Sequence, residues 1–160
     1  MKVGFFHGLE SAPRSEKNVI LESIYGKENV YAPPMNYRNP DLYTEILNHL
    51  RENPVDLLIG SSMGGYFAHA LSSHINKPAL LFNPALHGRP YNPENVTYGE
   101  YKPIHLFILG RQDTVVNPLE TLKIISNADY TGPVTIGMEN IGHRIPAAVF
   151  EKRLNEFILV

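Results

Sequence analysis

The stretch Leu57-Leu58-Ile59-Gly60-Ser61-Ser62-Met63-Gly64-Gly65-Tyr66 joins an apolar run to a segment with helical spacing. It contains the pattern Gly-x-Ser-x-Gly, with Gly60, Ser62 and Gly64 at the fixed positions. A serine in this pattern lies at a sharp strand-to-helix turn, and the glycines lack the β-carbons that would keep the two elements apart. The turn lifts the serine hydroxyl above the sheet and leaves the first N–H groups of the helix, including that of Met63, facing outward. The pattern therefore predicts that Ser62 is a nucleophile; the alternative is a tight turn whose glycines serve packing only.

Short apolar runs and segments with helical periodicity alternate along the rest of the chain. Each apolar run is bounded by Gly, Pro or Asn, which predicts buried strands at Val3–His7, Val30–Ala32, Leu57–Gly60, Ala79–Phe82, His105–Leu109 and Val134–Gly137. Helical spacing predicts helices at about residues 19–25, 40–50, 63–75, 118–125 and 146–159. The alternation predicts one α/β domain over residues 1–160. We expect a three-layer sandwich in which helices cover both faces of a six-stranded, mostly parallel sheet.

Local signals predict where helices begin and which side they bury. Asn39–Pro40 and Asn117–Pro118 each combine a capping residue with a first-turn proline, and Glu120 adds a feature like a capping box. In the fourth helix the spacing predicts a buried face of Leu119, Leu122 and Ile125. In the last helix it predicts a buried face of Phe150, Leu154, Phe157 and Ile158.

The composition excludes several classes of protein. The 160 residues carry 14 Lys and Arg against 16 Asp and Glu, a net charge of -2, so no basic field attracts nucleic acid or anionic membranes. No segment approaches the roughly 20 apolar residues of a membrane span, and the first apolar stretch is too short for a signal peptide. Because the chain has no cysteine, it cannot form disulfides or thiolate metal sites. We expect a cytoplasmic protein that binds neither nucleic acid nor membrane, with an oligomeric state that the composition leaves open.

One connection interrupts the alternation of strands and helices. Residues 85–103, between the fourth and fifth predicted strands, are polar and rich in proline and tyrosine. A loop of this length inside a compact domain is commonly a functional cover. We expect residues 85–103 to form a lid-like loop over a shallow site, with an unstructured surface excursion as the alternative.

The sequence offers Ser62 both a base and an acid. A serine hydroxyl is a weak nucleophile that a histidine activates, and an acidic side chain orients that histidine. In α/β proteins with this serine turn, the chain order is Ser, then Asp or Glu, then His. Asp113 follows the fifth predicted strand, and His143 follows the sixth, so both meet Ser62 at the carboxyl edge of the sheet. We predict Ser62, Asp113 and His143 as catalytic residues; Glu139 is an alternative acid, and an exposed loop histidine is the alternative for His143.

The segment after the first predicted strand offers a second group for the site. His7-Gly8-Leu9 follows that strand directly, and in this architecture such a turn supplies an N–H group that binds the oxyanion of the reaction. The predicted oxyanion donors are therefore the backbone N–H groups of Leu9 and Met63. Two roles are open for His7, which either braces the loop by hydrogen bonding or touches the substrate.

The histidine spacing does not favour a metal site. His69 and His74 are five positions apart, so on a helix their side chains diverge by roughly 140°. A zinc-binding helix needs histidines four apart on one face, and no carboxylate cluster compensates here. We predict no metal and no cofactor.

The motifs resemble those of a known group of proteins. The chain is similar to small α/β-hydrolases, and most of all to the compact bacterial YqiA-like esterases. Those proteins carry a similar His-Gly-x-x-Ser-x-Pro opening (His7 to Pro13 here), the elbow Gly-Ser-Ser-x-Gly-Gly-Tyr (Gly60 to Tyr66) and Asn-Pro-Ala after the next strand (Asn83 to Ala85). The resemblance implies a minimal α/β-hydrolase fold with Ser62 as nucleophile, His143 as base and Asp113 as acid. One departure is the acid loop Gly-Arg-Gln-Asp, which is closer to the broad superfamily than to this subgroup.

These observations predict a serine hydrolase that cleaves carboxylic esters or thioesters through an acyl-serine intermediate. Its partner is then a small-molecule acyl ester. Two alternatives stay open: acyl transfer by the same residues to an acceptor other than water, and a non-catalytic protein-binding module on the same scaffold. For the binding module, Tyr91, Tyr98 and Tyr101 are the expected recognition residues, since tyrosine is enriched at protein interfaces.

Overall fold

The computed structural model describes residues 1–9, 11, 15–93, 95–127 and 132–158. Its sheet has six strands in the order β2-β1-β3-β4-β5-β6, and every neighbouring pair is parallel. The strands are β1 (Val3–Phe6), β2 (Val30–Tyr31), β3 (Leu57–Ser61), β4 (Ala79–Phe82), β5 (His105–Gly110) and β6 (Val134–Glu139). The helices are α1 (Glu16–Tyr25), α2 (Leu42–Glu52), α3 (Met63–Ile75), α4 (Pro118–Ile125) and α5 (Ala147–Ile158), with a short 3-10 helix, η1 (Lys27–Asn29). Of the residues used in the predictions above, Pro13 and Leu159 lie outside the described residues.

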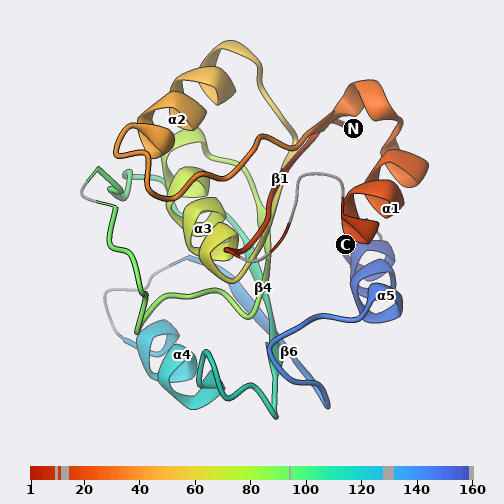
Figure 1. The fold of residues 1–160 in the computed structure, drawn as a ribbon, viewed down its shortest axis with the longest axis vertical. Coiled ribbons are helices and arrows are strands. Elements are labelled where there is room, and N and C mark those ends of the chain that lie inside the picture. The colour runs from red at the N-terminus through yellow and green to blue at the C-terminus, as the bar shows by residue number, and fades with distance from the viewer. Residues whose placement is uncertain (10, 12–14, 94, 128–131, 159–160) are drawn as a thin grey trace.

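The helices cover both faces of the sheet, as predicted. Helices α2, α3 and α4 lie on one side of the strands, and α1 and α5 lie on the other (Figure 1). Each side has its own apolar core: Phe67 and Leu71 of α3 belong to the first, and Leu21 of α1 and Phe150 of α5 belong to the second. The three-layer α/β sandwich is therefore confirmed.

The two edge strands differ from the predicted pattern of fully buried runs. Strand β2 has two residues, both half-buried, whereas four of the six residues of β6 are half-buried and two are exposed. An edge strand has a neighbour on one side only, so its side chains are covered less completely than those of the inner strands. The prediction of continuous burial was wrong for these two strands.

Two helix details also differ from the predictions. Helix α2 begins at Leu42 rather than Pro40, because Asn39 bends the chain before it: the Asn39 side chain accepts a hydrogen bond from the Asp41 N–H at 3.0 Å. Helix α4 begins as predicted, with the Asn117 side chain capping the Leu119 N–H. Of the predicted buried face, Ile125 is buried and Leu122 packs against the core, whereas Leu119 is 62% exposed. Pro118 and Thr121 are buried beside them.

The parallel arrangement brings several loops together at one edge of the sheet. All six strands run the same way, so the residues that follow each strand emerge at the same edge. Ser62 follows β3, Asp113 lies in the loop after β5, and His143 lies in the loop between β6 and α5. The edge that carries the candidate site is therefore a direct consequence of the strand direction.

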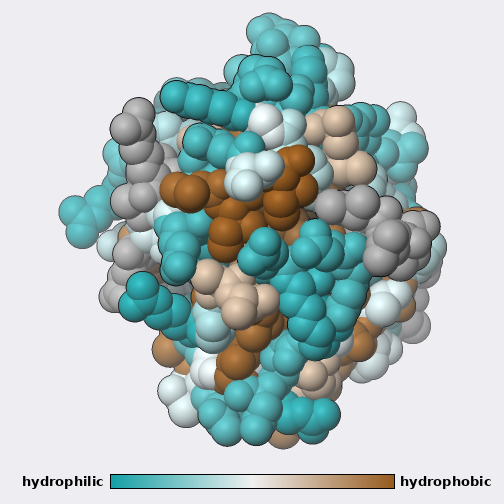
Figure 2. Space-filling model, turned by 90° about the vertical axis from the view of Figure 1, so that its right-hand side faces the viewer, coloured by the Kyte–Doolittle hydropathy of each residue, from teal (hydrophilic) through white to brown (hydrophobic). Residues whose placement is uncertain are grey.

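The face formed by α1 and α5 exposes hydrophobic side chains. Figure 2 looks at the molecule from this side and shows hydrophobic residues gathered near its centre between hydrophilic ones. On these two helices, Val19 is 63% exposed, and Ile20, Ile24, Val149 and Phe157 are only partly buried against the core beneath. Within the described part of the chain, no helix is long and apolar enough to cross a membrane.

The packing of α5 yields a test of the second core. Phe150 is completely buried, with ring centroids 5.9 Å from Phe5 and 4.9 Å from Phe82. Phe150→Ala should lower the free energy of unfolding by about 3–5 kcal/mol, because it leaves a cavity between α5 and the sheet. Urea unfolding monitored by circular dichroism measures this loss. Val149→Ala, at the half-buried neighbouring position, is the control and should cost about 1 kcal/mol or less. Equal losses in the two variants would contradict the packing described here.

Candidate active site

Ser62 lies in a strained backbone conformation between β3 and α3. Its φ of 55° and ψ of -120° are unusual for a residue with a side chain, and such a conformation costs about 1–3 kcal/mol. Backbone hydrogen bonds hold it there: the Ser62 N–H donates to the Phe82 carbonyl at 3.0 Å, and the Ser62 carbonyl accepts from Tyr66 and Ala85 at 3.1 and 2.9 Å. The turn is thus fixed to the end of β4 as well as to the first turn of α3.

Two glycines allow β3 and α3 to approach each other around this turn. A β-carbon at Gly60 would overlap the backbone of Gly64, and one at Gly64 would overlap the Phe6 carbonyl at the end of β1. No L side chain fits at either position. The glycines of the Gly-x-Ser-x-Gly pattern therefore have the packing role that the sequence predicts.

The structure brings Ser62, His143 and Asp113 together in a chain of hydrogen bonds. The His143 Nε2 atom lies 3.0 Å from the Ser62 Oγ atom, and the His143 Nδ1 atom lies 2.8 Å from the Asp113 Oδ2 atom. A carboxylate only accepts hydrogen bonds, so Asp113 fixes the proton on Nδ1 and leaves Nε2 to accept the Ser62 hydroxyl proton. These are the contacts that a general base for Ser62 requires.

Asp113 is rigidly held. Its side chain is fully buried, and its second oxygen, Oδ1, accepts hydrogen bonds from the N–H groups of Val115 and Val116, both at 2.8 Å. The alternative acid, Glu139, pairs instead with Arg153 at 2.6 Å. The His143 side chain is 27% exposed, so this chain of hydrogen bonds ends near solvent, where a substrate could reach it.

The backbone segments that carry the predicted oxyanion donors lie next to Ser62. A β-carbon on Gly8 would be only 3.2 Å from the Ser62 Cβ atom, so the backbone before Leu9 passes directly beside the serine. Met63 is the first residue of α3, and the first N–H groups of a helix have no acceptor within the helix.

Two side chains hold the segment before Leu9, and one of them was not predicted. The His7 Nδ1 atom lies 2.8 Å from the Gly8 carbonyl, and the buried Tyr37 hydroxyl donates to the His7 carbonyl. The carbonyl and N–H of one peptide bond point in opposite directions, so holding the Gly8 carbonyl also sets the direction of the Leu9 N–H. His7 thus braces the loop, and no spacing signal in the sequence points to Tyr37.

His7 is suited to this contact as a neutral side chain. It is 5% exposed, and its Nε2 atom is buried without a hydrogen-bond partner. Burial lowers the pKa of His7, which the hydrogen bond to the Gly8 carbonyl opposes in part. The neutral ring donates its Nδ1 proton to the carbonyl and leaves Nε2 without a charge to solvate.

The long connection after β4 is attached to the helices over its second half. The Tyr43 hydroxyl donates to the Thr97 carbonyl at 2.9 Å, and the Gly99 and Tyr101 N–H groups donate to the hydroxyl and carbonyl of Ser73 at 2.8 and 3.1 Å. These contacts hold residues 97–101 against α2 and the end of α3, away from Ser62. A cover over the site stays a prediction, which we now limit to residues 85–93.

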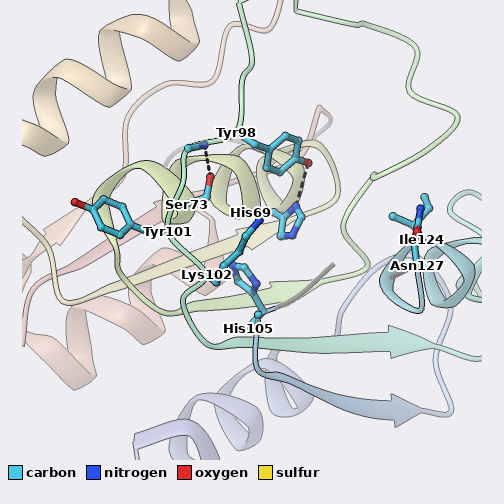
Figure 3. A pocket seen from close by; sticks show the side chains of 10 residues that line it. His69, Ser73, Tyr98, Tyr101, Lys102, His105, Ile124 and Asn127 are labelled. Carbon is cyan, nitrogen blue, oxygen red and sulfur yellow. Dashed lines mark hydrogen bonds between the residues drawn. The ribbon is translucent and has the colours of Figure 1, made fainter. Parts of the chain in front are cut away.

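A pocket of about 290 Å³ lies at the other end of the sheet (Figure 3). His69 and Ser73 of α3 line it together with Tyr98 and with His105 at the start of β5, and the His69 Nδ1 atom lies 3.0 Å from the Tyr98 hydroxyl. Asp113 follows the far end of β5, so the pocket is separate from the Ser62 site. Among the described residues, no group of three or more His, Asp or Glu side chains is arranged to hold a metal ion.

Comparisons with known proteins agree with this fold. Residues 2–100 match the model of an uncharacterised protein family, UPF0227, which confirms the resemblance to the YqiA-like proteins. No curated protein matches the sequence.

Solved structures with the same architecture include several enzymes. A protein of the alpha/beta hydrolase superfamily from Xanthomonas campestris is 16% identical, with 97% of each chain covered and a TM-score of 0.69. Esterase PE8 is 15% identical, with 99% of this chain and 91% of that chain covered and a TM-score of 0.72. A monoacylglycerol lipase from Paleococcus ferrophilus is 14% identical, with 98% and 93% covered and a TM-score of 0.69. At these identities the similarity establishes the α/β-hydrolase fold.

The buried histidines at the pocket predict how stability depends on pH. Burial lowers the pKa of His105 from 6.5 to about 4. As the pH falls from 6.5 towards 4, the unfolded chain binds a proton at His105 that the folded protein excludes, so the free energy of unfolding decreases. His105→Gln should make this decrease smaller, as measured by urea unfolding at pH 7 and pH 5. An unchanged difference between the two pH values would show that His105 titrates alike in both states.

Proposed function

We propose that this chain, which belongs to the uncharacterised protein family UPF0227, is a serine hydrolase that cleaves carboxylic esters or thioesters. The observation that carries the proposal is the pair of His143 contacts, 3.0 Å to the Ser62 hydroxyl and 2.8 Å to the Asp113 carboxylate. Solved proteins of the same fold include an esterase and a monoacylglycerol lipase, which supports an ester as the substrate.

The first half of the reaction transfers the acyl group to Ser62. His143 Nε2 takes the hydroxyl proton while Ser62 Oγ forms a bond to the acyl carbon, and the carbonyl electron pair moves onto oxygen. When the carbonyl forms again, the bond to the leaving alkoxide or thiolate breaks, and the imidazolium gives that group its proton. Asp113 stabilises the imidazolium and keeps the ring in place throughout.

The negative oxygen formed in this step needs hydrogen-bond donors beside Ser62. The N–H groups of Leu9 and Met63 come from the two backbone segments that flank the serine, the loop after β1 and the start of α3. Each such donor contributes about 3–4 kcal/mol to the transition state. The bracing of the Gly8 carbonyl by His7 fixes the first donor before the substrate arrives.

The second half of the reaction releases the acid. His143 removes a proton from water, the resulting hydroxide attacks the acyl carbon, and the proton returns to Ser62 as its bond to the acyl group breaks. An acceptor alcohol or amine in place of water would make the same residues an acyltransferase. Adding such acceptors to the assay and analysing the products by mass spectrometry separates the two outcomes.

Replacing Ser62 tests the proposal directly. Ser62→Ala removes the nucleophile and should lower kcat on a short-chain nitrophenyl ester by about 10⁶-fold, to the background rate. The control is Ser61→Ala, since Ser61 is the adjacent residue at the end of β3 and should be dispensable. Full turnover by Ser62→Ala would refute the assignment. A wild-type chain without turnover on any ester would favour the protein-binding alternative.

Replacing Asp113 separates the orienting acid from the base. Asp113→Asn keeps the size of the side chain but can donate to Nδ1, which favours the wrong tautomer of His143 and should lower kcat by about 10⁴-fold. Glu139→Gln is the control and should retain activity, because Glu139 pairs with Arg153 and not with His143. A larger loss of activity in Glu139→Gln than in Asp113→Asn would identify Glu139 as the acid.

A further inference from the structure

His143 reaches Ser62 only by crossing the ends of two other strands. Ser62 follows β3 and His143 follows β6, and the sheet order places β4 and β5 between them. Three strand spacings correspond to about 14 Å. The segment between β6 and α5 must therefore be held across the carboxyl edge if the imidazole is to stay at the serine.

The end of β5 holds the first part of this segment. The Arg111 N–H donates to the Glu139 carbonyl at 2.9 Å, and the Gln112 N–H donates to the Ile141 carbonyl at 3.0 Å. Gly110 lets the segment pass closely, because a β-carbon there would lie 2.6 Å from the Ile141 carbonyl oxygen and 2.7 Å from that of Gly142.

The end of β4 holds the second part through one side chain, Asn83. Its Nδ2 atom donates to the Gly142 carbonyl at 3.1 Å and to the His143 carbonyl at 3.0 Å. Its Oδ1 atom accepts from the Gly110 N–H at 2.7 Å. The amide thus uses both of its N–H groups on the backbone of the segment that carries the imidazole, and its oxygen on the strand that leads to Asp113.

The surroundings of Asn83 make these contacts specific. Asn83 is 2% exposed, so little water competes for its hydrogen bonds, which are stronger in a buried environment. Its backbone φ of 41° lies in the left-handed region, which asparagine tolerates better than most residues. Its own N–H donates to the Ile108 carbonyl at 2.9 Å, which keeps it in register with β5.

We propose that Asn83 is the positioning residue that holds the His143 imidazole between Ser62 and Asp113. The proposal rests on the function proposed above, because it concerns the same site. Asn83 contacts the backbone of His143 and not the reacting atoms. It therefore affects the reaction only by setting the position of the imidazole. Asn83 is the first residue of the Asn-Pro-Ala motif. The sequence alone assigns no role to this asparagine.

Asn83→Asp is the most selective variant. It keeps the size of the side chain and the acceptor for the Gly110 N–H, but it turns a carboxylate oxygen towards the carbonyls of Gly142 and His143. Repulsion should move the imidazole, and a displacement of about 1 Å lowers kcat by about 100-fold. KM should change little, since no substrate contact is lost.

Asn76→Asp is the matched control. Asn76 also has a left-handed backbone, with φ of 53°, but it caps the far end of α3 and is exposed. This variant should keep the wild-type kcat. Asn83→Gly is a second variant, which suits the backbone and removes all three side-chain hydrogen bonds; its kcat should fall at least as far as that of Asn83→Asp.

A double-mutant cycle distinguishes positioning from a general loss of structure. In a His143→Ala background no imidazole remains to be placed, so Asn83→Asp should leave the residual rate unchanged. A 100-fold loss in both backgrounds would overturn the proposal, as would a wild-type kcat in Asn83→Asp.

Nuclear magnetic resonance tests the same placement without any substrate. In histidine-¹⁵N-labelled protein, the Nδ1 proton shared with Asp113 is assigned to His143 by its absence in His143→Ala. Asn83→Asp should make this proton exchange with water faster, and Asn76→Asp should not. If the wild type hydrolyses no ester, this comparison still decides the role of Asn83, so the two proposals can fail separately. An identical exchange rate in wild type and Asn83→Asp would overturn the positioning role.

Discussion

The close approach of β3 and α3 around Ser62 sets the position of the serine hydroxyl, and the rest of the site is built around it. Gly60 and Gly64 allow it, because a β-carbon at either position would overlap neighbouring backbone. The approach forces Ser62 to a φ of 55°, a conformation that costs free energy by itself. Hydrogen bonds to the end of β4 and the first turn of α3 offset that cost. The strain presents the hydroxyl above the sheet edge, where other loops can reach it.

The parallel sheet determines which loops those are. The carboxyl ends of β1, β4, β5 and β6 lie at the same edge as Ser62, and each contributes a different contact. The loop after β1 lies against the serine, the loop after β5 carries Asp113, and the loop after β6 carries His143. The residue after β4, Asn83, joins the last two. The site is thus distributed over strands that are distant in the sequence, and backbone hydrogen bonds between the loops fix its geometry.

Much of this could be predicted from the sequence, because the features involved are local. The elbow at Ser62 follows from its two glycines, and the order of strands places Asp113 and His143 at the same edge. The missed features depend on partners distant in the sequence. Thr121 is buried on α4 where Leu119 was predicted, and its hydroxyl lies 3.4 Å from the Nε2 atom of His87, which is 34 positions earlier in the chain. Tyr37 and Asn83 act on backbone carbonyls 30 and 60 positions away, which no periodicity or motif identifies.

In the proposed mechanism, His143 activates only one serine of the adjacent pair Ser61 and Ser62. Reaction with a fluorophosphonate, followed by peptide mapping by mass spectrometry, tests this activation, since the reagent marks an activated serine and needs no knowledge of the substrate. We predict a single adduct, on Ser62, whose formation is lost in His143→Ala. An adduct on Ser61, no adduct at all, or labelling that is unchanged in His143→Ala would contradict it.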